Sequence, residues 1–400
     1  MFLLLIIAGG YHELEKRKLM PVYDTDEVSW IFTGYYFNLY FLQFDLFHPD
    51  WSDYEAFDHP PLAKYIIGGS LYLKGYTINS LDLKRSLNMT PDMEFMKRYV
   101  SLLPHVPNPA ITIPWTRSVI FGFALSSLLL AYGFVRISHG ALPAFISILL
   151  IMSDPNFNSV STRILADPVL LFFFTLFLLL CTLYLKSSKN IYLLFAFMIS
   201  ALAFLTKLNG IVLLFVLIIA FLIKNKFSIA KEDGRYLFIG FCLFILINVI
   251  LNPVFLNTGM GAMIRMIEIR LSAFHVFRET FKEFALLSLD QRFLAATQRI
   301  FFNSSVFYRY IGIPVELIMF MAGLCYIFKK KDLFMIAIFI FLVIIPISIL
   351  PYNIPRYFYW ISPFVYIIAG LSVGFFKEIG VKGRYLIEKR RQGWKQCVNQ

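Results

Sequence analysis

The sequence predicts an all-α membrane protein, a bundle of about ten transmembrane helices, for three reasons. Of its 400 residues, 58% are hydrophobic and 16% are charged, whereas soluble domains average roughly 45–50% apolar and about 25% charged residues. Apolar runs long enough to cross a bilayer recur along the chain. Lysine and arginine collect on one side of these runs. A soluble globular enzyme, a disordered chain and a nucleic-acid-binding protein are therefore excluded.

The apolar runs define the predicted spans. A helical span needs about 20 mostly apolar residues, and six runs approach this length: 116–135, 164–185, 236–251, 310–328, 332–350 and 357–376. Three shorter runs with short flanks are interpreted as tightly connected spans: 140–153, 191–205 and 208–223. Residues 1–10 are apolar but follow no basic residues, so we favour a partial first span over a secretory signal. The alternative is that the first helix starts before residue 1.

The distribution of basic residues predicts the orientation. If the amino terminus is cytoplasmic, most lysines and arginines between the spans lie inside, together with the basic tail at 377–400. The short outer loops then hold only Arg163, Lys207 and Arg356. This asymmetry follows the positive-inside rule. Two long segments, 11–114 and 252–309, face outward, and neither is bounded by a linker, so we treat 1–400 as a single domain.

The beginning of the first outer segment is rich in aromatic residues. After Glu27, apolar side chains recur at helical spacing: Val28, Ile31, Phe32, Tyr35 and Leu39. This pattern is typical of a helix that lies in the membrane interface. A helix packed against the bundle explains it equally well.

Ionisable residues collect at the outer ends of the predicted spans. Such residues are costly at membrane depth and are functional candidates by default. They are Asp26, Glu27, Asp58, His59, Lys64, Arg163, Asp167, Lys207 and Arg356.

Each of these residues also has a simpler structural explanation. Arg163 and Asp167 have the i,i+4 spacing of a helix-surface ion pair, and Lys207 is placed to extend its ammonium group to the interface. Asp26 and Glu27 suit the amino terminus of a helix. These explanations do not account for the convergence of both signs of charge at one depth.

This convergence suits sugar transfer from a lipid-linked phosphate. Lysine and arginine neutralise a departing phosphate, and a carboxylate accepts the proton of an attacking hydroxyl. The sequence has no glycine-rich loop of the P-loop kind, which argues against ATP-driven transport. The four cysteines lie outside the long outer segments, and no Cys/His spacing indicates zinc. A zinc site is therefore not expected.

The segments that carry these charges resemble the protein O-mannosyltransferase-like branch of the membrane GT-C glycosyltransferases, which use polyprenyl- or dolichyl-phosphate sugars. Asp26-Glu27 is similar to the paired acidic motif of that family. Residues 58–64 resemble its His-Pro-Pro-Leu-x-Lys stretch. Residues 161–167 and 203–210 resemble its Ser-Arg…Asp segment and its Lys-x-x-Gly turn, and Arg356-Tyr357 resembles its basic site before the last span.

The resemblance implies transfer of mannose from the lipid carrier to a protein Ser/Thr hydroxyl, by inverting displacement at the outer face. It implies that Asp26 is the general base and that Glu27 orients the base or the acceptor. The other candidates bind the substrate or support the site. Lys207 and Arg356 meet the carrier phosphate, His59 and Lys64 shape the pocket, and Arg163 and Asp167 brace the site.

Three alternatives remain open. Segment 252–309 is too short for the large folded luminal domain of eukaryotic protein mannosyltransferases. A glycolipid or polysaccharide acceptor therefore remains an alternative to a protein acceptor. The resemblance to the protein mannosyltransferase branch implies that no cofactor or metal ion is required. Some members of the superfamily do need a divalent cation, however, and Asp24-x-Asp26 has the form of a metal-binding pair. A transporter or flippase is the alternative of another class, although the charges lie at one interface and no repeat is found. The resemblance implies a cell membrane or the endoplasmic reticulum, with the site on the extracytoplasmic side.

Overall fold

The computed structural model describes residues 25–87, 102–187, 189–227, 231–259, 261–280, 282–303, 305–350, 352–381 and 388. The predicted partial span 1–10, Asp24 and most of the basic tail lie outside the described residues. All the regular elements described are helical, and a single isolated bridge, between Ala285 and Tyr352, has β geometry. The predicted all-α class is therefore confirmed for this part of the chain.

The first outer segment forms a series of short helices. They are α2 (Thr25–Thr33), α3 (Tyr35–Phe37), η1 (Asn38–Leu42), η2 (Pro49–Ser52), α4 (Tyr54–Asp58), α5 (Leu62–Tyr72), α6 (Ser80–Leu87) and η3 (Leu103–His105).

The long helices follow. They and their connections are α8 (Pro109–His139), α9 (Ala141–Ser153), α10 (Pro155–Ser161), α11 (Ala166–Ser187), α12 (Asn190–Thr206), η4 (Leu208–Ile211), α13 (Val212–Lys224) and α14 (Lys231–Leu251). Helix α11 packs between α8 and α12, and α12 packs against α14.

The second outer segment and the carboxyl-terminal helices complete the fold. The segment contains α15 (Pro253–Thr258), α16 (Gly261–Thr280), η5 (Lys282–Phe284), α17 (Leu289–Thr297), η6 (Gln298–Asn303) and α18 (Val306–Ile311). The last helices are α19 (Val315–Lys330), α20 (Leu333–Phe339), η7 (Ile340–Ile344), α21 (Ile345–Ser348), α22 (Pro355–Phe358) and α23 (Ser362–Gly370). Helix α23 packs against α9 and α19.

Four helices in the described residues are long and apolar enough to cross a membrane: Pro109–His139, Ala166–Ser187, Gly234–Leu251 and Ser362–Val381. Four further apolar helices are shorter: Ala141–Ser153, Asn190–Thr206, Leu208–Lys224 and Leu333–Ser348. The predicted count of about ten spans is not confirmed. The run predicted at 332–350 contains a π-helical turn, η7. Pro346 has no N–H to donate, which weakens the helical ladder at this turn.

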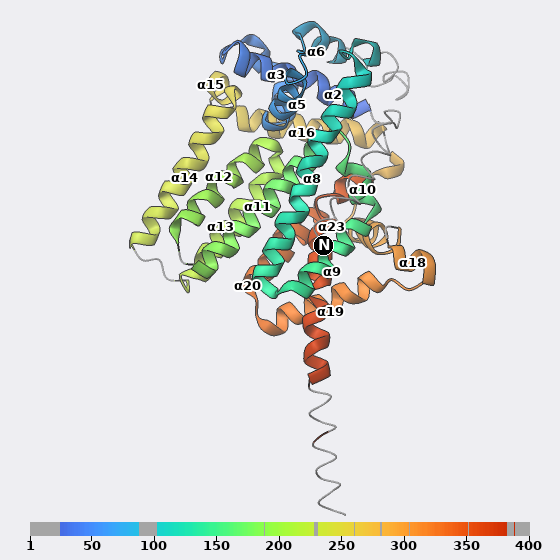
Figure 1. Ribbon diagram of the computed structural model, residues 1–400. Coiled ribbons are helices and arrows are strands. Elements are labelled where there is room, and N and C mark those ends of the chain that lie inside the picture. The colour runs from blue at the N-terminus through green and yellow to red at the C-terminus, as the bar shows by residue number, and fades with distance from the viewer. Residues whose placement is uncertain are drawn as a thin grey trace, which may run out of the picture.

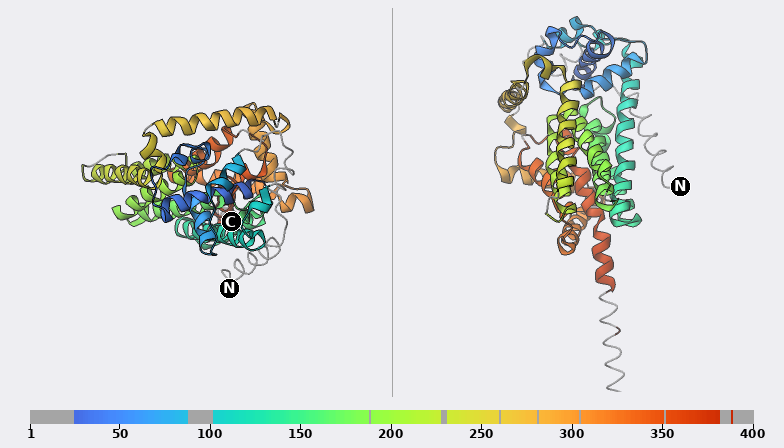
Figure 2. Two further views of the ribbon diagram at one scale, coloured as in Figure 1. Left: turned by 90° about the horizontal axis from the view of Figure 1, so that it is seen from above. Right: turned by 90° about the vertical axis from the view of Figure 1, so that its left-hand side faces the viewer.

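The short amino-terminal helices cover one end of the long helices (Figures 1 and 2). Three hydrogen bonds fasten this cover to the ends of α14 and α8. The Tyr40 hydroxyl donates to the Ile250 carbonyl at 2.9 Å, the Tyr65 hydroxyl to Leu251 at 3.1 Å, and the Trp115 indole to Ser70 at 2.7 Å. The cover is thus held directly above the ends of the spans.

The chain between α2 and α3 touches α5 through glycine. A Cβ on Gly68 would lie 2.4 Å from the carbonyl oxygen of Gly34, so no larger residue fits there without a shift of the backbone. The apolar side chains predicted for an interfacial helix are all buried in the protein: Val28, Ile31, Phe32, Tyr35 and Leu39. Packing against the bundle, the second of the two interpretations, is the one observed. It fixes the residues that begin α2 over the ends of the long helices.

Candidate active site at the covered end of the bundle

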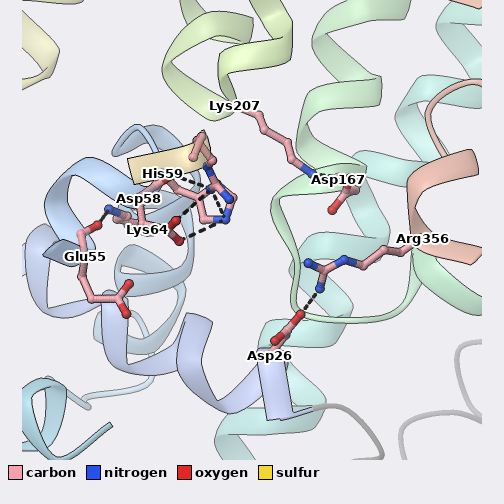
Figure 3. A network of polar contacts seen from close by, with 9 residues as sticks. Asp26, Glu55, Asp58, His59, Lys64, Asp167, Lys207 and Arg356 are labelled. Carbon is pink, nitrogen blue, oxygen red and sulfur yellow. Dashed lines mark hydrogen bonds and ion pairs between the residues drawn. The ribbon is translucent and has the colours of Figure 1, made fainter. Parts of the chain in front are cut away.

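Asp26 and Arg356 form an ion pair between the two ends of the chain. Asp26 lies in the first turn of α2 and Arg356 lies in α22, and the guanidinium Nη1 contacts the Asp26 carboxylate (Figure 3). The Asp26 and Arg356 side chains are 40% and 29% exposed. The Arg356 guanidinium also lies 5.4 Å from the centre of the Tyr357 ring. A carboxylate and a cation therefore share an open position at the cover.

Asp167 and Lys207 form a second, more buried pair. The Lys207 ammonium donates to Asp167 Oδ1 at 2.8 Å, joining the start of α11 to the end of α12. The predicted i,i+4 pair of Arg163 and Asp167 on one helix is corrected here. Helix α11 begins at Ala166, so Arg163 lies before the helix, in the bend that follows α10.

A glycine holds the turn that presents Lys207. The backbone of Lys207 is extended, and the Gly210 N–H donates to the Lys207 carbonyl at 2.8 Å. A Cβ at position 210 would lie 2.3 Å from the carbonyl carbon of Ala203 in α12. Only glycine therefore lets η4 fold back closely enough to aim Lys207 at Asp167.

Glu27, the neighbour of Asp26, points into the protein. Its two carboxylate oxygens accept from Arg117 Nε at 2.9 Å and Arg117 Nη2 at 2.7 Å, and Oε1 also accepts from the Ile164 N–H at 3.0 Å. Glu27 thus ties α2 to α8 and to the turn before α11. The sequence reasoning missed Arg117, although an arginine inside the predicted span 116–135 was a signal of its own.

Asp58 and His59 meet an arginine from the second outer segment. Arg270 of α16 places Nη2 3.3 Å from Asp58 Oδ1 and 2.7 Å from His59 Nε2. The His59 ring also lies 4.8 Å from the Trp30 ring. Burial, reinforced by Arg270, lowers the pKa of His59 well below its usual value. His59 is therefore neutral at pH 7. Nothing in the sequence of α16 singled out Arg270.

Lys64 lies within the first outer segment. Its ammonium group donates to the Glu55 carbonyl and lies 4.7 Å from the centre of the Tyr36 ring. The side chain is buried, and burial lowers its pKa to about 8. Figure 3 shows Lys64 turned toward Glu55, while Asp26, Asp167, Lys207 and Arg356 lie together in another part of the view.

The described residues contain no group of three or more His, Cys, Asp or Glu side chains placed to hold a metal ion. Asp24, the partner of Asp26 in the alternative metal pair, lies outside the described residues.

Residues 116–251 match the family model described as dolichyl-phosphate-mannose-protein mannosyltransferase. The matched segment runs from α8 to α14 and includes Arg163, Asp167 and Lys207. Over this segment, the chain is similar to that family. The predicted resemblance to the protein mannosyltransferase-like GT-C glycosyltransferases is confirmed over this segment.

One solved oligosaccharyltransferase structure shares this fold. The oligosaccharyltransferase of Archaeoglobus fulgidus in its apo form is 13% identical, with a TM-score of 0.51, over 97% of this chain and 52% of the other. The archaeal oligosaccharyltransferase AglB from the same organism, solved with an inhibitory peptide and a dolichol-phosphate, is 14% identical, with a TM-score of 0.49, over 90% and 48%. The chain thus spans about half the length of these structures. No curated protein matches the chain.

Proposed function

We propose that this protein transfers a sugar from a polyprenyl- or dolichyl-phosphate carrier to an acceptor hydroxyl by inverting displacement. The contact between Asp26 and Arg356 carries this proposal. It brings a partly exposed carboxylate and a partly exposed guanidinium to one position above the spans. A displacement at a lipid-linked sugar needs these two groups side by side, one for the attacking hydroxyl and one for the departing phosphate.

Asp26 is the proposed general base. As the acceptor oxygen forms its bond to the anomeric carbon, the carboxylate takes the hydroxyl proton, an effect worth about 10²–10⁴ in rate. The bond between the anomeric carbon and the phosphate oxygen breaks, and its electron pair leaves with the carrier phosphate. Attack from the face opposite the phosphate inverts the anomeric configuration.

Arg356 and Lys207 are the proposed phosphate-binding cations. Each is paired with a carboxylate in this structure, with Asp26 and Asp167 respectively. The Asp26–Arg356 pair is the more exposed, and exposed pairs contribute only about 0–1 kcal/mol. An arriving phosphate therefore draws the Arg356 guanidinium away from the Asp26 carboxylate at small cost.

Five residues support the site in this proposal. Glu27 is a positioning residue that fixes the start of α2 through Arg117. Asp167 orients Lys207, and Arg163 braces the turn before α11. His59 and Lys64 hold the first outer segment in shape.

Mannose and a protein acceptor are the preferred substrates, because the description of the matching family model names both. The Ser/Thr hydroxyl is the acceptor group that the resemblance of the sequence motifs implies. A glycolipid or polysaccharide acceptor is the second candidate, favoured by the shortness of segment 252–309. The four apolar helices support a location in the membrane, and the asymmetry of basic residues supports a site on the extracytoplasmic face. We propose no required metal ion or cofactor.

A transfer assay tests the proposal. Purified protein in detergent receives radiolabelled polyprenyl-phosphate mannose and a Ser/Thr-rich peptide, with and without a divalent cation. Label on the peptide supports protein O-mannosylation. Label that moves only to an added glycolipid supports the second candidate. Label that stays on every carrier, whichever sugar and acceptor are supplied, contradicts the proposed activity.

A further inference from the structure

The loop that leads to Arg356 is held by the second outer segment. We propose that Arg299, in η6, is a positioning residue for Arg356: it fixes the loop from which Arg356 reaches the carrier phosphate. This inference rests on the proposed function and adds a residue that the site itself does not contain.

Arg299 grips one residue of this loop at two points. Its Nε donates to Asn353 Oδ1 at 2.8 Å, and its Nη2 donates to the Asn353 carbonyl at 3.1 Å. A planar guanidinium makes both bonds at once, whereas a lysine ammonium lacks this fork. The side chain and the backbone of Asn353 are therefore fixed together.

The same segment holds the backbone from the other side. The Asn353 N–H donates to the Phe284 carbonyl at 2.9 Å, and Tyr352 forms the isolated β-bridge with Ala285. Arg292 of α17 joins the segment to α21, the helix that precedes the loop. Its Nε donates to the Leu286 carbonyl at 3.3 Å, and its Nη1 donates to the Ser348 carbonyl of α21. The loop is thus bound along its length.

The segment η6, which carries Arg299, is itself bonded to the helix bundle. Ile300, the residue after Arg299, is buried, and its carbonyl accepts from the Tyr366 hydroxyl at 3.0 Å. Tyr366 belongs to α23, so η6 is fastened to a buried helix of the bundle. Arg299 therefore connects the loop, through η6, to the buried helix α23.

Little freedom remains between Asn353 and Arg356. Ile354 is extended, and Pro355 begins α22 with its φ angle fixed by the proline ring. Fixing Asn353 consequently fixes the direction in which α22 starts and the place from which the Arg356 guanidinium reaches out. If Asn353 is released, Arg356 samples other positions and meets the phosphate less often in the right geometry.

A double-mutant experiment tests this inference. The transfer rate is measured against donor concentration for wild type, Arg299→Ala, Arg356→Ala and the double variant. A misplacement of about 1 Å can cost about 10²-fold, and we expect Arg299→Ala to raise the donor KM by about tenfold without changing the acceptor KM. In the Arg356→Ala background it adds nothing, because the residue that it positions is absent.

Controls separate positioning from folding. Lys282→Ala removes an exposed charge of the same segment, paired only with Glu279 among the ion pairs observed here, and leaves kinetics unchanged. If Arg299→Ala lowers the melting temperature, Asn353→Ala replaces it, since that variant removes only the side-chain acceptor of the grip. The donor KM of Arg299→Lys is expected to lie between that of wild type and that of Arg299→Ala.

The outcomes separate the two proposals. A normal donor KM in Arg356→Ala contradicts the role of Arg356 in the proposed function. A raised donor KM in Arg356→Ala with a normal one in Arg299→Ala overturns the inference alone. Independent, multiplying effects of the two substitutions also overturn it, because Arg299 then acts by another route.

Discussion

Two adjacent acidic residues have different environments, and their burial separates their roles. The Asp26 side chain is 40% exposed beside Arg356, whereas the Glu27 side chain is 2% exposed beside Arg117. A partly exposed pair separates at low cost, but breaking a buried pair leaves an uncompensated charge in the interior. Asp26 is therefore suited to exchange partners during a reaction, and Glu27 is suited to hold α2 in place.

Removing Arg117 tests this division. Arg117→Ala leaves Glu27 charged and without its cationic partner in the interior, at a cost of about 3–5 kcal/mol. We expect a clear fall in the melting temperature in detergent, with partial recovery when Glu27→Gln is added. Arg356→Ala is the matched comparison and leaves stability nearly unchanged. Equal stability of Arg117→Ala and wild type would show that this pair is not structural.

Lys64 gives stability a dependence on pH. Burial lowers its folded pKa from 10.5 to about 8, so between these values the folded protein binds fewer protons than the unfolded chain. Stability then rises with pH across this window, by up to about 3 kcal/mol. Below pH 8 both states are protonated and the gain is absent. The measurement is the melting temperature of wild type and of Lys64→Met at pH 7.5 and at pH 10. The melting temperature of wild type should rise relative to that of the variant at pH 10. The same difference at both pH values would contradict the role of Lys64.

At the scale of elements, the Lys207 turn depends on a glycine that lies against α12. A Cβ at Gly210 meets the backbone of Ala203, so Gly210→Ala must push η4 away and turn Lys207 from Asp167. We expect a lower melting temperature and a raised donor KM. Gly122→Ala is the control, since a Cβ there meets nothing within 4 Å and alanine is the better helix former. Identical behaviour of the two variants would refute the role of the turn.

The local sequence pattern predicted most of the long helices, but it misplaced the start of α11 because the effect of Pro168 was overlooked. The hydropathy runs located α8, α11, α12 and α14, and the motif around Gly210 located the turn. The Arg163–Asp167 spacing misled because Pro168 confines the helix start. Its ring clashes with the carbonyl four residues earlier, so it is tolerated only in the first turn. Arg163 therefore lies outside α11.

At the scale of the whole molecule, the sequence predicted which charges share a face but not which charges pair. Sidedness follows from hydropathy and basic residues alone. Pairing depends on how distant helices pack: Glu27 meets Arg117 across 90 positions, and Arg270 meets His59 across 211. The position of Arg117 inside a predicted span marks it as unusual, but one sequence does not show which residue it pairs with. The partners of Arg117 and Arg270 therefore appeared only in the structure.

The predicted orientation is testable by cysteine labelling. In a variant without its natural cysteines, we introduce Ser52→Cys in the first outer segment or Lys226→Cys beyond α13. A membrane-impermeant maleimide added to intact cells should label position 52, and it should label position 226 only after permeabilisation. Both positions are accessible in the structure. The reverse pattern would place the candidate site on the cytoplasmic side.

The central claim is that Asp26 accepts the proton of the acceptor hydroxyl, and one measurement addresses it directly. The initial rate of transfer is compared for wild type and Asp26→Asn at saturating donor, with the melting temperature of each recorded. Asparagine keeps the size of the side chain and loses its basicity, so we predict a fall of about 10²–10⁴ in rate without loss of fold. A folded Asp26→Asn variant that transfers sugar at the wild-type rate would contradict the account.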